Sequence, residues 1–222
     1  MADSVTDFHQ AFERVRNQVI MGNAHLHLWK GLSRRLRTEP PQLLANTAPT
    51  FFGLTLESHL DAAFLYAAKV FDTHRKPLTL WTILRDAQAN IGSLSPEASN
   101  ELSQVLLESD TKLVKLESSL KAVRIRRNKV IAHLDLDAVR NPDKVTKRSQ
   151  ISVDDLKNIF EVALEILNGV SGPYWGLYGS LKLLDVDDFE RALDLIKQQK
   201  QNLFAEIKAE FPDMIGEDLL PR

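Results

Sequence analysis

The pattern of hydrophobic and polar positions is helical along most of the chain. From Asp110 to Asp137, apolar residues recur at intervals of three and four, which is the spacing of one face of an α-helix. The stripe consists of Leu113, Leu116, Leu120, Val123, Val130 and Leu134. Its missing step is Arg127. Because a buried guanidinium is costly unless a partner compensates it, we expect this helix to reach a polar pocket or a partner there.

Similar periodicity predicts further helices, at about residues 4–36, 50–72, 79–91, 96–109, 152–172 and 186–209. The first has a break near Gly22 as an alternative, and the fourth either breaks at Ser109 or continues into the central stretch. Leu203 is expected on the inner face of the last helix. The polar segment AVRNPDKVTKRSQ after residue 137 predicts a loop. No strand pattern survives, so we predict an all-α, antiparallel up-and-down helical bundle with an additional C-terminal helix.

Several helix ends carry recognisable signals. Ser95 before Pro96 is typical of an N-cap followed by proline in the first helical position. Ser152 and Asp155 resemble a capping box, and Gly172 with Pro173 predicts the end of the helix that follows them. The next residues, YWGLYGS, concentrate aromatic side chains that either stack on bases or close a helix end against the core. We favour the second interpretation.

Charge is distributed unevenly along the 222 residues, although the net charge is only −2. The segment 112–148 holds eleven Lys or Arg against four Asp or Glu, and the rest holds seventeen against twenty-six. Such asymmetry steers a polyanion to one face, or simply forms a solvated helix surface. The chain has no cysteine, which excludes disulfides and thiolate metal sites. Without a secretory signal or an apolar run of roughly 18 residues, we expect a cytoplasmic protein with no membrane segment.

Most catalytic signatures are absent, and candidate chemistry narrows to one cluster. The cluster contains Arg124, Arg126, Arg127, Asn128, Lys129, His133 and Asp135. At about 100° per residue, an α-helix places Arg126, Lys129 and His133 on one face, with Arg127 turned toward the apolar stripe.

A histidine beside fixed cations suits cleavage of RNA. Histidine titrates in the right range to deprotonate the ribose 2′-hydroxyl or to protonate the leaving oxygen. Arginine can hold the phosphate and stabilise charge that develops in the transition state. This chemistry needs no metal or cofactor, so none is expected, and it is specific to RNA because DNA lacks the 2′-hydroxyl. The plainer alternative is an ordinary solvated helix face.

The segment RRNKVIAHLD resembles the signature of the HEPN superfamily, in which an Arg and a polar neighbour precede a His by four to six residues. Arg127-Asn128 and His133 fit with five intervening residues. Many members have four, which would put the arginine at position 128, where this chain has Asn. Arg126 shares a helix face with His133 and remains an alternative to Arg127 as the functional arginine. The trailing AHLD is similar to the AbiU-like branch linked to bacterial abortive infection. The resemblance covers roughly residues 45–170 and extends loosely to KVFD, which ends at Asp72.

The resemblance implies a HEPN-like bundle over residues 1–172, with its core at about 45–170, and a C-terminal helical extension over 173–222. It also implies a homodimer in which Arg127 and His133 of both chains form a composite, metal-independent ribonuclease site. Arg124, Arg126, Asn128, Lys129 and Asp135 would support the site or bind RNA. An antitoxin or another defence protein is a further expected partner.

Three hypotheses follow. The leading one is a dimeric endoribonuclease of the toxin or abortive-infection type. The second is a non-catalytic module of the same fold that binds RNA, a nucleotide or a protein. The third is a structural dimer without any role in nucleic-acid binding.

Overall fold

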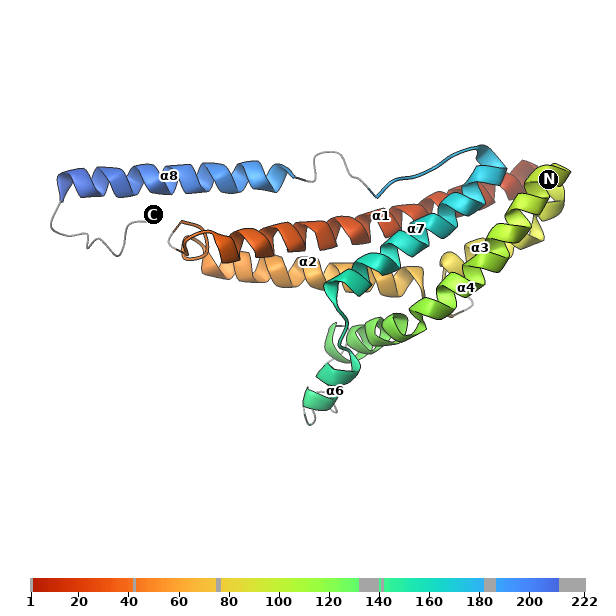
Figure 1. Ribbon diagram of the computed structural model, residues 1–222, viewed down its shortest axis with the longest axis horizontal. Helices are drawn as coiled ribbons and strands as arrows, with labels where there is room; N and C mark the ends of the chain where they lie inside the picture. The colour runs from red at the N-terminus through yellow and green to blue at the C-terminus, as the bar shows by residue number, and fades with distance from the viewer. Residues whose placement is uncertain are drawn as a thin grey trace. The chain divides into compact units, whose positions relative to one another are not determined.

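The computed structural model describes residues 2–41, 43–74, 77–131, 140, 142–181 and 187–211. Within these ranges the chain is helical and has no strand, which confirms the predicted all-α helical bundle (Figure 1). The elements are α1 (Ala2–Thr38), α2 (Pro49–Val70), α3 (Leu80–Ala89), the 3₁₀ turn η1 (Ile91–Ser93), α4 (Pro96–Arg126), the π-helical turn η2 (Arg127–Ile131), α6 (Pro142–Arg148), α7 (Val153–Trp175) and α8 (Asp188–Glu210). None of the described helices is long and apolar enough to cross a membrane.

The chain divides into two compact units. The first unit comprises Met1–Ala24 and Asp61–Leu183, and the second comprises His25–Leu60 and Leu184–Arg222. Helices α1 and α2 therefore each contribute residues to both units. The cluster predicted from the sequence belongs to the first unit.

The core of the first unit is built on the apolar stripe of α4. Leu113, Leu116, Leu120 and Val123 are buried as predicted, and α4 packs mainly against α7. Burying each such side chain contributes about 1.5–3 kcal/mol relative to leaving it in water. The stripe therefore holds α4 in one rotational setting, and that setting determines where the residues at its C-terminal end lie.

Helix α1 runs through Gly22 without a break, so the alternative of two helices is wrong. A Cβ atom at Gly22 would lie 2.3 Å from Cε1 of Phe160 and 2.8 Å from Cβ of Tyr66. The glycine thus serves the close approach of α7 and α2 to α1 rather than a change in chain direction.

The structure decides between the two alternatives for Ser109 in favour of a continuous helix, and it corrects the expectation of a loop after residue 137. Helix α4 passes through Ser109, whose buried hydroxyl donates to the Val105 carbonyl at 2.7 Å instead of ending the helix. The segment predicted as a loop contains α6, a helix of two turns. Buried Val145 and Ser149 lie on its inner side, and this packing compensates for the weak periodic signal of a short, charged segment.

The two ends of α7 differ in how well they were predicted. The capping box of Ser152 and Asp155 is confirmed, and Ser95 likewise caps α4 before Pro96. The predicted stop at Gly172 and Pro173 is wrong, since α7 continues to Trp175. It ends at Gly176, whose positive φ of 63° is the left-handed conformation that glycine adopts at helix ends.

Aromatic packing explains the extra turn of α7. The ring of Trp175 lies 5.5 Å from that of Phe8 and 5.0 Å from that of Phe12, both on α1. The hydroxyl of Tyr174 donates to the Ala87 carbonyl at 2.8 Å. These contacts confirm that Tyr174 and Trp175 close the helix end against the core, although Tyr178 is 73% exposed.

The second unit has its own apolar cluster, in which α8 takes part. Leu32, Leu44, Phe52 and Leu193 are its buried members. Around it, Arg35 lies 3.3 Å from Glu190 and 3.5 Å from Glu39. Leu203 is 43% exposed, so the expectation that it faces inward is wrong. The N-cap of α8 is Asp187, whose side chain makes no capping hydrogen bond. The sequence also suggests Asp185 as a cap for this helix, and that residue lies outside the described residues.

Candidate functional site

The cluster predicted from the sequence begins where α4 changes its hydrogen-bonding pattern. Residues Arg127–Ile131 form the π-helical turn η2, a rare geometry that is frequent at functional sites. A π turn holds one more residue than an α turn, so it shifts the faces of the residues that follow. Val130 is accordingly 52% exposed, and its predicted place on the apolar stripe is wrong.

Arg127 has the compensating partner that its place in the stripe requires. Its Nη1 lies 3.2 Å from Oδ2 of Asp72, and its Nε donates to Oδ1 of Asn128 at 2.8 Å. The side chains of Arg127 and Asp72 are only 23% and 18% exposed. The Arg127–Asp72 ion pair therefore compensates the guanidinium at the end of the apolar stripe. This confirms the expectation that Arg127 meets polar surroundings there.

Asp72 also accepts two hydrogen bonds from His74. The backbone N–H of His74 donates to Oδ1 of Asp72 at 2.9 Å, and the ring Nδ1 lies 2.5 Å from the same oxygen. Burial raises the pKa of Asp72, but the contacts with His74 and Arg127 outweigh burial and lower the pKa to about 2. Asp72 is therefore a fixed anion at neutral pH.

The contact with Asp72 orients the ring of His74. A carboxylate that accepts a hydrogen bond from Nδ1 fixes the tautomer of the ring and leaves Nε2 on its far side. The side chain is 75% exposed, which leaves it accessible. Sequence analysis does not identify His74 as a candidate. The signal that could have found it is the Asp72-x-His74 spacing directly after the long apolar helix.

Arg126 contacts the C-terminal half of α2, the helix that leads to Asp72. Its guanidinium carbon lies 4.5 Å from the centre of the Phe64 ring, and Nη2 lies 3.8 Å from Oδ1 of Asp61. Its buried Nε has no hydrogen-bond partner among the described residues. Arg126 and Arg127 thus hold the end of α4 to two separate carboxylates, one for each arginine.

The remaining predicted residues divide into those the structure describes and those it does not. Arg124 donates to the Leu120 carbonyl of its own helix at 3.3 Å, so its side chain is not brought to Asp72. Asn128 is exposed and Lys129 is half-buried. His133 and Asp135 lie outside the described residues, and the predicted common face of Arg126, Lys129 and His133 stays a prediction.

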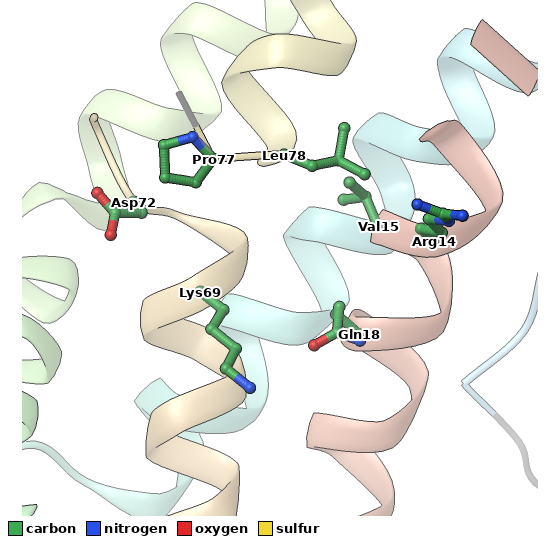
Figure 2. Close-up of a pocket in the computed structure, with 7 residues that line it drawn as sticks. All are labelled: Arg14, Val15, Gln18, Lys69, Asp72, Pro77 and Leu78. Atoms are coloured by element: carbon green, nitrogen blue, oxygen red, sulfur yellow. The ribbon is translucent and has the colours of Figure 1, made fainter. Parts of the chain in front are cut away.

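A pocket of about 300 Å³ opens beside Asp72 (Figure 2). Its lining comes from α1, from the end of α2 and from the segment before α3: Arg14, Val15, Gln18, Lys69, Asp72, Pro77 and Leu78. All seven residues belong to the first unit. Among the described residues, no group of three or more His, Asp or Glu side chains is placed to hold a metal ion.

Comparison with known proteins gives one finding. A family model of a HEPN domain, described as AbiU2, matches residues 6–197. No curated protein and no solved structure matches the chain.

Proposed function

The chain belongs to the AbiU2 family of HEPN domains, and from this premise we propose that it is an endoribonuclease of the abortive-infection effector type. In this proposal Arg127 binds the scissile phosphate and His133 transfers a proton. A second copy of the chain completes the site with the same two residues. The substrate is RNA because the reaction uses the ribose 2′-hydroxyl as its nucleophile.

The observation that carries the proposal is the setting of Arg127. A guanidinium has five N–H donors, and the contacts with Asp72 and Asn128 use Nη1 and Nε. In the part of the chain that the structure describes, no contact uses Nη2, so this edge is available to a phosphate oxygen. Since two contacts already fix the side chain, little rotamer freedom is lost when the phosphate binds, and the positive charge is in place before negative charge builds up in the transition state.

The chemistry requires a base and an acid. A histidine removes the proton of the 2′-hydroxyl, whose oxygen attacks the adjacent phosphorus as the bond to the 5′-oxygen breaks. A proton donor protonates that leaving oxygen, and a 2′,3′-cyclic phosphate results. A dimer supplies His133 twice, so one copy can act as the base and the other as the acid.

The test is incubation of the purified chain with total RNA in excess EDTA, beside His133→Ala and Arg127→Ala. Arg85→Ala serves as the matched control, because Arg85 is exposed and contacts only its neighbour Asp86 among the described residues. We expect wild type and the control to produce cyclic phosphate ends, with both site variants reduced at least about a hundredfold.

Three outcomes would contradict the proposal or its composite site. Cleavage that survives in both site variants would assign the activity to another site or to a contaminant. If no variant cleaves but RNA is retained in a filter-binding assay and lost at higher salt, the chain is a binding module. Sedimentation of the wild type at micromolar concentration tests the dimer, and a monomer that cleaves RNA would rule out the composite site.

A further inference from the structure

We propose that the pocket beside Asp72 binds a single nucleotide of the RNA and gives cleavage its base preference. The inference rests on the proposed function for its biological meaning, although nucleotide binding itself does not require cleavage. It assigns a ligand class, a nucleoside monophosphate unit, to a cavity that lies outside the Arg127 and His133 motif.

The first argument is charge. Arg14 and Lys69 both line the pocket and are exposed, and among the described residues neither has a carboxylate partner. The Asp72 carboxylate does not serve them, because its oxygens accept hydrogen bonds from Arg127 and His74. Lys69 lies over the Tyr66 ring at 5.4 Å, so two cations without a carboxylate partner among the described residues line one pocket, and they favour a ligand that carries an anionic group such as a phosphate.

The second argument is the shape and polarity of the lining. Leu78 is 40% exposed and Pro77 is exposed, so these two residues provide apolar surface for the face of a base in the pocket that buried Val15 also lines. Gln18 also lines the pocket, and in Figure 2 it lies below Val15 and across from the end of the Lys69 side chain. An amide both donates and accepts hydrogen bonds, so it can read the edge of an unstacked base.

The third argument is size and position. Ligand sites usually have volumes of about 300–1,000 Å³, and a pocket of about 300 Å³ lies at the lower limit, where it suits one nucleotide and no longer segment. Asp72 is both a wall of this pocket and the partner of Arg127. A nucleotide bound here is therefore adjacent in the RNA to the phosphate that Arg127 holds.

The binding test uses the full chain carrying His133→Ala, so that any ribonuclease activity is removed. The four nucleoside 5′-monophosphates and inorganic phosphate are titrated by calorimetry. Lys69→Met should weaken nucleotide binding about tenfold through loss of one charged contact. Gln18→Leu should reduce the difference among the four bases, and Lys115→Met, an exposed lysine on α4, should change nothing.

Equal binding of all four nucleotides by wild type, Lys69→Met and Gln18→Leu would overturn the proposal. Binding of inorganic phosphate as tight as that of the nucleotides would reduce the pocket to an anion site and also overturn it.

A second readout separates this inference from the ribonuclease proposal. Mapping the cleaved ends should show a base preference for the wild type and a broader pattern for Gln18→Leu. If the wild type cleaves and Gln18→Leu gives the same pattern, the nucleotide pocket fails while the ribonuclease stands. If nucleotides bind as expected and no RNA is cleaved, the ribonuclease fails while the pocket stands.

Discussion

Replacing Asp72 by Asn tests the electrostatic reasoning about the site most directly. The variant keeps the size of the side chain but removes the charge that faces Arg127 and His74. The pKa of Asp72 is lowered from its ordinary value of 3.8 to about 2. At about 1.36 kcal/mol per pKa unit, the charged form contributes on the order of 2 kcal/mol to stability at neutral pH.

The sign and the pH range of the effect follow from the same values. Because the pKa is lower in the folded chain than in the unfolded chain, the contribution is complete above about pH 5 and is lost as the pH falls toward 2. About half should remain at pH 3. Asp72→Asn should therefore be destabilised by on the order of 2 kcal/mol at pH 7, and its difference from wild type should shrink below pH 5.

Urea unfolding, monitored by tryptophan fluorescence, measures the difference in stability between Asp72→Asn and wild type in the first unit. Trp81 and Trp175 belong to the first unit and Trp29 to the second, so a Trp29→Phe background reports the unit that contains Asp72. Asp110→Asn, on an exposed position of α4, is the control. If Asp72→Asn is no less stable than the control at pH 7, or if its deficit is the same at pH 7 and pH 3.5, the reasoning is refuted.

Other expected outcomes concern packing and a histidine pair. Gly22→Ala should cost about 1–3 kcal/mol in urea unfolding because its new methyl group overlaps the Phe160 ring, whereas Gly53→Ala, with no atom within 4 Å of the added carbon, should stabilise by about 0.5–1 kcal/mol. The Nδ1 atoms of His25 and His59 lie 2.8 Å apart, and burial lowers the pKa of both rings, with the charge of His59 adding to the effect at His25. Since a lowered histidine pKa favours the neutral form, stability should fall as the pH drops below about 6.5, and His25→Gln with His59→Gln should flatten this dependence between pH 7 and pH 5. An equally steep pH dependence in the double variant would contradict the assignment.

The sequence predicted the helices well where a single face is buried. The stripe of α4 from Leu113 to Val123 and the caps at Ser95 and Ser152 depend on residues close in sequence, so spacing alone reveals them. The extension of α7 through Pro173 depends on contacts with α1, about 160 residues earlier, which no local rule contains.

Only part of the candidate site could be predicted, because its residues come from distant parts of the sequence. The interruption of an apolar stripe by Arg127 showed that the side chain needs a partner, but nothing in the spacing identified Asp72, which lies 55 residues earlier. His74 became a candidate only through Asp72. The pocket was not predictable, because its lining comes from three separate segments.

The π turn fixes the point, relative to Arg127, at which the helical phase changes. A hydrogen bond that spans five residues instead of four accommodates one inserted residue within a single turn, without disturbing the helix before it. Residues after such an insertion keep the orientation that they would have in an uninterrupted helix one residue shorter. Arg127 is the first residue of this turn, so its side chain keeps the phase of α4 and meets Asp72, whereas Val130, later in the turn, is exposed. Within five residues, the end of the helix thus combines an ion-paired, partly buried arginine with exposed side chains on another face.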